Sequence, residues 1–117
     1  MTRINAGIQP SELSDKHLLA EHREIKRIPN NIKKGKYSFV GQPEQFTLGK
    51  GHVKFFYDKM FYLADRYEEL YEECIRRGFK VTYYGDAWVG VPASFWHQWE
   101  PTDRDRELVL ARIKCRS

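Results

Sequence analysis

The chain has 117 residues, of which 41% are hydrophobic, 15% aromatic and 31% charged. This length suits a single domain, which we expect to span residues 1–117, and the composition excludes a disordered or collagen-like chain. No apolar run is long enough for a membrane-spanning helix, and no signal peptide is recognisable. Cys74 and Cys115 form no CxxC pair, so we expect the protein in a reducing cytoplasm.

The net charge of +4 is distributed unevenly along the chain. Residues 1–36 contain eight Lys/Arg and four Asp/Glu, whereas residues 37–117 contain twelve of each and sum to zero. A basic excess confined to one third of a chain is typical of a protein that binds a polyanion. A solvated basic surface without a partner explains the charge equally well.

The first predicted helix begins either near Pro10 or at Ser14 and runs to about Ile28. Pro29 disfavours helical geometry in the residue before it, and the asparagine pair 30–31 is a turn signal. The pattern therefore predicts one helix that ends where the proline begins.

The second predicted helix has the strongest signal in the chain. Its apolar residues recur at alternating steps of three and four and form one stripe, which we interpret as core packing: Met60, Leu63, Tyr67, Leu70 and Cys74. We expect Asp58 to cap the start of this helix and Gly78 to terminate it.

A third helix is predicted from the capping-box pattern of residues 102–105 to about Cys115. The connection from Lys33 to Lys50 is glycine-rich and polar. The connection from Tyr83 to Pro101 holds all three tryptophans, so we expect it to be a packed irregular segment. No strand pair is convincing, and the sequence predicts a small all-α domain of three main helices.

One face of the first helix combines polar groups of several kinds at steps of four and three. It carries an imidazole, a carboxylate and a guanidinium among the residues Leu13, His17, Ala20, Glu24 and Arg27. Leu18, Ile25 and Ile28 lie elsewhere and are expected to face the core. Spacing alone favours an ion pair on a solvated helix face, so periodicity does not identify an active site here.

The first residues offer a reactive amine. Thr2 is small, so we expect removal of Met1 to leave a free α-amino group on Thr2. An α-amine is roughly one third unprotonated at pH 7.5, against about 0.1% of a lysine, and the unprotonated form is the nucleophile. The four histidines share no helix face, so no metal site is expected.

Several motifs occur together and in order. They are Met1–Asn5, Ser11–Leu13, His17–Leu18, Ala20–Glu24, Leu48–Lys59, Glu73–Cys74 and Arg77–Phe79, with a weaker match at Ala111–Ile113. In combination they resemble the phage pyrimidine-dimer DNA glycosylase/AP lyase family, the endonuclease V family of ultraviolet repair. The resemblance covers most of residues 1–81 and patches of 100–116.

This resemblance implies a fold of three helices with the N-terminus threaded near the first of them. It also implies a mechanism without metal or cofactor. The Thr2 amine would attack C1′ of the damaged nucleotide, displace the base and form an imine, after which elimination would nick the strand. Glu24 matches the essential carboxylate, which would stabilise the developing positive charge and transfer protons.

The resemblance further implies a double-stranded DNA partner that contains a lesion. The residues that match the family's DNA-binding positions are Arg3, His17, Arg23, Arg27, Arg112 and Arg116. Arginine suits this task because its planar fork binds phosphate oxygens in pairs. We expect a monomer, since no apolar stripe remains for a partner, and a host-cell cytoplasm if a phage encodes the chain.

Two alternatives stay open at this point. The same scaffold could act as an abasic-site lyase or on another modified base, and a basic DNA-binding protein without chemistry would use Glu24 structurally. The sequence also departs from the family pattern. One extra residue between Asn5 and the first helix is expected to bulge outwards. The family's aromatic tail has no counterpart before Ser117, so either the segment 83–88 replaces it or the range of lesions differs.

Overall fold

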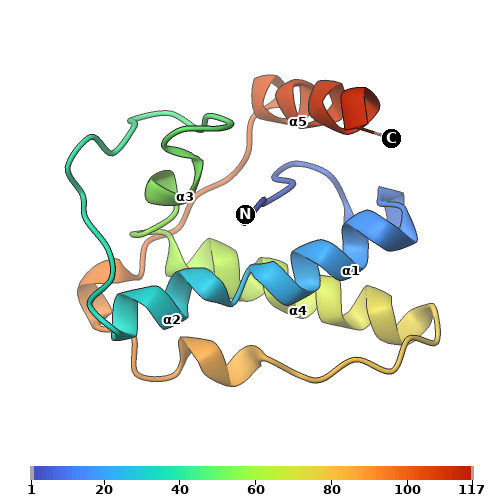
Figure 1. Cartoon of the computed structure of the whole chain (residues 1–117), viewed down its shortest axis with the longest axis horizontal. Coiled ribbons are helices and arrows are strands. Elements are labelled where there is room, and N and C mark those ends of the chain that lie inside the picture. The colour runs from blue at the N-terminus through green and yellow to red at the C-terminus, as the bar shows by residue number, and fades with distance from the viewer. Residues whose placement is uncertain (1, 117) are drawn as a thin grey trace.

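The computed structural model describes residues 2–116, without the side chain of Arg116 (Figure 1). Its elements are the α-helices α1 (Asp15–Glu24), α2 (Arg27–Lys33), α3 (His52–Phe55), α4 (Met60–Arg76) and α5 (Asp103–Arg116), and the 3-10 turns η1 (Pro10–Glu12), η2 (Gly85–Trp88) and η3 (Ala93–Phe95). These described residues form no strand, which confirms the all-α prediction. Within the same residues, no helix is both long and apolar enough to cross a membrane.

Helix α4 supplies the centre of the core. All five residues of its predicted apolar stripe are fully buried, with 0% of each exposed. Helix α1 packs along α4 (Figure 1), and Leu18, Ile25 and Ile28 are buried as predicted. The interpretation of the stripe as core packing is therefore confirmed.

The first predicted helix is two helices in the structure, so its predicted end at Ile28 is wrong. Helix α1 starts after Ser14, whose Oγ accepts the His17 backbone N–H, and ends at Glu24. Helix α2 then follows, with Pro29 as its third residue. A proline is tolerated there because the first N–H groups of a helix have no acceptor within the helix. The asparagine pair thus lies inside α2 and forms no turn.

The two ends of α4 differ in how well they were predicted. Asp58 does not cap the helix, because the N-cap is Lys59 and the Asp58 carboxylate instead accepts hydrogen bonds from Gln42 and Lys59. Gly78 terminates the helix as predicted, with φ = +85°. The N–H of Phe79 reaches back to the carbonyl of Cys74 at 2.9 Å, which closes a Schellman motif.

Helix α5 begins with the predicted capping box. The N–H of Thr102 donates to the Asp105 carboxylate, and the N–H of Asp105 donates to the Thr102 hydroxyl. The segment before it is packed and irregular, as predicted, and includes η2 and η3. Trp88 is buried, and Trp96 and Trp99 are partly buried against the core.

The N-terminal segment, residues 2–8, runs between α1 and α5 (Figure 1). Its residues Ile4, Ala6 and Ile8 are buried in the core. A turn closed by the Ile8 N–H and the Asn5 carbonyl folds the segment back, with Gly7 at φ = +83° against Arg106 of α5. The connection between Asn5 and the first helix is therefore a packed turn, with Ala6, Ile8 and Pro10 buried, and the expectation that it bulges outwards is wrong.

Candidate functional site

A small cavity lies where the N-terminal segment, α1 and α5 meet. Its volume is about 50 Å³, and its lining residues are Arg3, Asn5, His17, Ala20, Glu21, Glu24, Arg112 and Ile113. The α1 members follow one another at steps of three (His17, Ala20) and four (His17, Glu21), with Glu24 one further turn on, so they share one face of the helix. Four predicted site residues, namely Arg3, His17, Glu24 and Arg112, come together here.

Thr2 lines a second hollow beside this cavity. The hollow has a volume of about 360 Å³ and is lined by Thr2, Arg3, Gly49, Gly51, His52, Val53, Lys54 and Arg112. Arg3 and Arg112 line both spaces. The start of the chain and the Glu24 carboxylate therefore border adjoining cavities that share two arginines. We call these two spaces together the N-terminal site.

Glu24 forms an ion pair with Arg23 at the end of α1 and is the less exposed of the two residues. Its side chain is 14% exposed, and its Oε2 lies 3.5 Å from Nη2 of Arg23, whose side chain is 57% exposed. A distance of 3.5 Å to a solvated guanidinium is a weak interaction. The residue also lines the cavity, together with Arg3 and Arg112.

His17 is held in place by the residue that caps its helix. The Oγ of Ser14 accepts the His17 backbone N–H at 3.2 Å and lies 2.9 Å from Nδ1 of the same residue. One serine therefore fixes both the start of α1 and the His17 ring at the edge of the cavity.

A buried hydrogen-bond network supports the floor of the N-terminal site. Arg66 of α4 binds the Glu21 carboxylate through two nitrogens, at 2.8 and 3.0 Å. The Asn5 amide donates to Glu21 at 2.8 Å and its oxygen accepts from Arg112 at 2.9 Å. Burial acts to lower the pKa of Arg66, but the Glu21 carboxylate outweighs it and raises that pKa above its usual value. The network therefore links four segments of the chain through charged hydrogen bonds.

Sequence reasoning missed Asn5 and Glu21 as site residues. Glu21 is part of the motif Ala20–Glu24 but has no assigned role there, although it lies four residues after His17 and three before Glu24. This spacing places it on the same helix face and was the available signal. Its partner Arg66 lies on a different helix, 45 residues away, which no local pattern reveals.

Two other predicted DNA-binding residues, Arg23 and Arg27, are not among the residues that line the two cavities. Arg23 is exposed beside Glu24, and Arg27 is exposed on α2. The break between α1 and α2 is the reason, since the three-residue step from Glu24 to Arg27 no longer runs along one helix. Leu13, predicted on the same face, precedes α1 and is buried in the core. The side chain of Arg116 lies outside the described residues.

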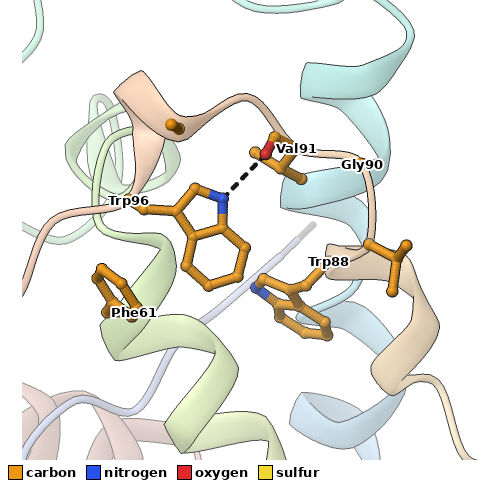
Figure 2. Close-up of a pocket in the computed structure, with 7 residues that line it drawn as sticks. Phe61, Trp88, Gly90, Val91 and Trp96 are labelled. Carbon is orange, nitrogen blue, oxygen red and sulfur yellow. Dashed lines mark hydrogen bonds between the residues drawn. The ribbon is translucent and has the colours of Figure 1, made fainter.

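A larger hollow occurs elsewhere, at η2 and η3 (Figure 2). It measures about 640 Å³ and is lined by Phe61, Trp88, Val89, Gly90, Val91, Ala93 and Trp96. The Trp96 indole N–H donates to the Val91 carbonyl at 3.0 Å, which fixes one wall. None of these seven lining residues is titratable, so this hollow offers no acid, base or nucleophile, in contrast to the N-terminal site. Within the described residues, no three His, Cys, Asp or Glu side chains group together as metal ligands would.

The fold and the site define a small all-α domain whose N-terminal segment borders a carboxylate among arginines. Residues 1–84 match the sequence family described as pyrimidine dimer DNA glycosylase, and this match covers more than half of the chain. The chain therefore belongs to the pyrimidine dimer DNA glycosylase family. It is a DNA-repair glycosidase with DNA as its substrate, so this part of the resemblance is confirmed. The matched range includes every predicted site residue except Arg112 and Arg116.

Proposed function

We propose that this glycosylase uses the α-amino group of Thr2, freed by removal of Met1, as its nucleophile and that it is also an AP lyase. The amine attacks C1′ of the damaged nucleotide, and the C1′–N bond to the base breaks with its electron pair leaving on the base. The nitrogen loses a proton and the C1′–O4′ bond breaks, with its electron pair and a proton going to O4′, so an imine joins Thr2 to C1′ of the opened sugar. Loss of a C2′ proton breaks the C3′–O bond, expels the 3′ phosphate and nicks the strand. Water hydrolyses the imine and releases Thr2.

Glu24 is assigned the proton transfers of this sequence. A carboxylate at the reacting sugar stabilises positive charge that develops at C1′, and it can accept the proton lost from C2′. The observation that carries the proposal is that Thr2 and Glu24 line adjoining cavities with Arg3 and Arg112 as shared walls.

Four arginines and one histidine around the N-terminal site are assigned to the DNA backbone. Arg3, His17 and Arg112 line the cavity, and Arg23 and Arg27 are exposed on the neighbouring surface of α1 and α2. Their position around the site and on the adjoining surface supports contacts to phosphates of the DNA backbone. Arg116, near the end of the same helix as Arg112, is assigned to the same task from the sequence resemblance alone.

We propose that the enzyme works as a monomer in a reducing cytoplasm. The free thiols of Cys74 and Cys115 support the reducing compartment, whereas the monomer rests on the sequence pattern, which leaves no apolar stripe for a partner. Oligomeric state is checked by light scattering of the purified protein with and without a duplex.

The assignment of Glu24 is tested with the variant Glu24→Gln on a duplex that carries one thymine dimer. We expect cleavage to fall by about 10²–10⁴-fold because the general acid–base group is lost, while DNA affinity is retained. Asp15→Asn is the matched control, because Asp15 lies at the opposite end of α1 and pairs with Arg77. Full cleavage by Glu24→Gln would contradict the assignment.

The same variant on a duplex with an abasic site separates the two activities. The proposal expects loss of strand cleavage on both duplexes, since imine formation and elimination use the same carboxylate. Loss on the dimer duplex alone would confine Glu24 to base removal and would contradict its role in the lyase step.

A further inference from the structure

His52 contacts the N-terminal segment directly. The backbone N–H of Ile4 donates to Nε2 of His52 at 2.9 Å, and Nδ1 lies 2.8 Å from the carbonyl oxygen of Thr47. The ring is buried, with edge-on contacts to Phe46 and Phe56. His52 also lines the hollow that contains Thr2. An imidazole far away in sequence thus holds the backbone two residues after Thr2.

These two contacts determine which nitrogen of the ring carries the proton. The Ile4 N–H can only donate, so Nε2 must offer its lone pair. The Thr47 carbonyl can only accept, so Nδ1 must carry the hydrogen. The ring is therefore neutral in the folded state, because a second proton on Nε2 would oppose the Ile4 N–H.

The surroundings of His52 favour this neutral form. Burial lowers the pKa of His52, and the nearby cations Arg112 of α5 and Arg3 of the N-terminal segment act in the same direction. The Thr47 carbonyl and the Glu21 carboxylate of α1 act in the opposite direction but do not outweigh burial. The acceptor lone pair is thus retained at neutral pH.

We propose that His52 is a positioning residue for the nucleophile: by accepting the Ile4 N–H, it sets where the Thr2 amine lies relative to Glu24. This inference rests on the proposed function of Thr2. Two residues span at most about 7 Å, so an anchor at Ile4 leaves Thr2 little freedom. The Asn5 side chain, bound to Glu21 and Arg112, fixes the next residue from the other side.

Two substitutions separate the contacts of the ring. In His52→Gln, the side-chain amide reaches the position of Nε2 and its oxygen can accept the Ile4 N–H. In His52→Asn, the shorter amide reaches the position of Nδ1, so it can donate to Thr47 but cannot reach Ile4. The two variants are matched, because each keeps one of the two hydrogen bonds of His52 and loses the other.

Three quantities are measured for each variant: protection of the Ile4 amide from hydrogen exchange, affinity for an abasic duplex, and the single-turnover rate of imine formation at Thr2. We expect His52→Asn to lose the Ile4 protection and to form the imine about 10- to 100-fold more slowly, because a displaced nucleophile loses its alignment. DNA affinity should be unchanged. His52→Gln should restore both the protection and most of the rate.

Equal losses of rate in the two variants, in step with their melting temperatures, would overturn the proposal and leave His52 a structural residue. An unchanged rate in His52→Asn would overturn it as well. Absence of any Thr2 adduct with the wild-type protein would instead overturn the proposed nucleophile, so failure of the two proposals is distinguishable.

Discussion

Arg23 and Glu24 are neighbours in the sequence but lie in different environments at the end of α1. The Glu24 side chain is 14% exposed at the cavity, whereas that of Arg23 is 57% exposed. A solvated guanidinium with a weak carboxylate contact can turn towards a phosphate at little cost. At the residue scale, we therefore assign chemistry to Glu24 and backbone binding to Arg23.

Arg23→Ala is expected to weaken binding to every duplex, damaged or not, because a phosphate contact carries no information about the lesion. The slope of log K against log salt should become shallower by about 1. Titrations at several salt concentrations measure both effects. Arg76→Ala is the matched control, since Arg76 is similarly exposed at the end of α4 and pairs with Glu73. A loss of affinity on dimer-containing DNA alone would contradict the assignment of Arg23.

At the scale of elements, the sequence predicts the helices that have a clear local pattern, but it does not predict the boundary between α1 and α2. The stripe of α4 and the capping box of α5 are local patterns, so the sequence alone revealed them. The break after Glu24 was missed because Pro29 looks like a helix end, although it fits equally well in the first turn of a new helix. That break also explains why Arg27 leaves the face that holds His17 and Glu24.

The Glu21–Arg66 pair joins α1 to α4 and is expected to matter for stability. Removing one partner leaves a buried charge without compensation, which costs about 3–5 kcal/mol. We therefore expect Glu21→Ala to lower the free energy of unfolding by this amount, measured by urea denaturation. Glu12→Ala, which removes an exposed pair with Arg106, should cost much less. Equal effects of the two variants would contradict the role of the buried pair.

At the scale of the whole molecule, stability is expected to fall on mild acidification. Burial lowers the pKa of both His22 and His52, from an ordinary value of 6.5. As the pH decreases below 6.5, the unfolded chain therefore binds more protons than the folded chain. The free energy of unfolding then decreases as the pH decreases. Hydrogen bonds from arginine side chains lower the pKa of Glu12 and of Glu73 from 4.5 to about 2. These two carboxylates therefore lose their contribution to stability only below about pH 4.5.

Melting temperatures between pH 7.5 and 5 test this expectation (the ordinary histidine pKa lies within that window). The wild-type protein should lose stability through this range, and His52→Gln should lose less because one of the two buried imidazoles is gone. His97→Gln is the control, since His97 is exposed. A wild-type melting temperature that is constant over the range would contradict the account.

The whole-molecule organisation of the site was predicted only in part. The motifs indicated that the N-terminus approaches the first helix, and the structure places residues 2–8 between α1 and α5. Local sequence patterns could not predict the contacts that hold this segment in place. His52, Arg66 and Arg112 contact it from positions 48, 58 and 107 residues further along the sequence. Such long-range polar contacts follow from the packing of helices and not from any spacing within one of them.

The central claim, that Thr2 carries the reaction, is tested most directly by borohydride trapping with peptide mapping. Reduction converts the imine to a stable bond, and the mapped peptide shows which amine formed it. On duplexes with a thymine dimer or an abasic site, protein that lacks Met1 should give an adduct at Thr2, and chemical acetylation of the N-terminus should abolish it. An adduct at a lysine, or no adduct with either duplex, would contradict the claim.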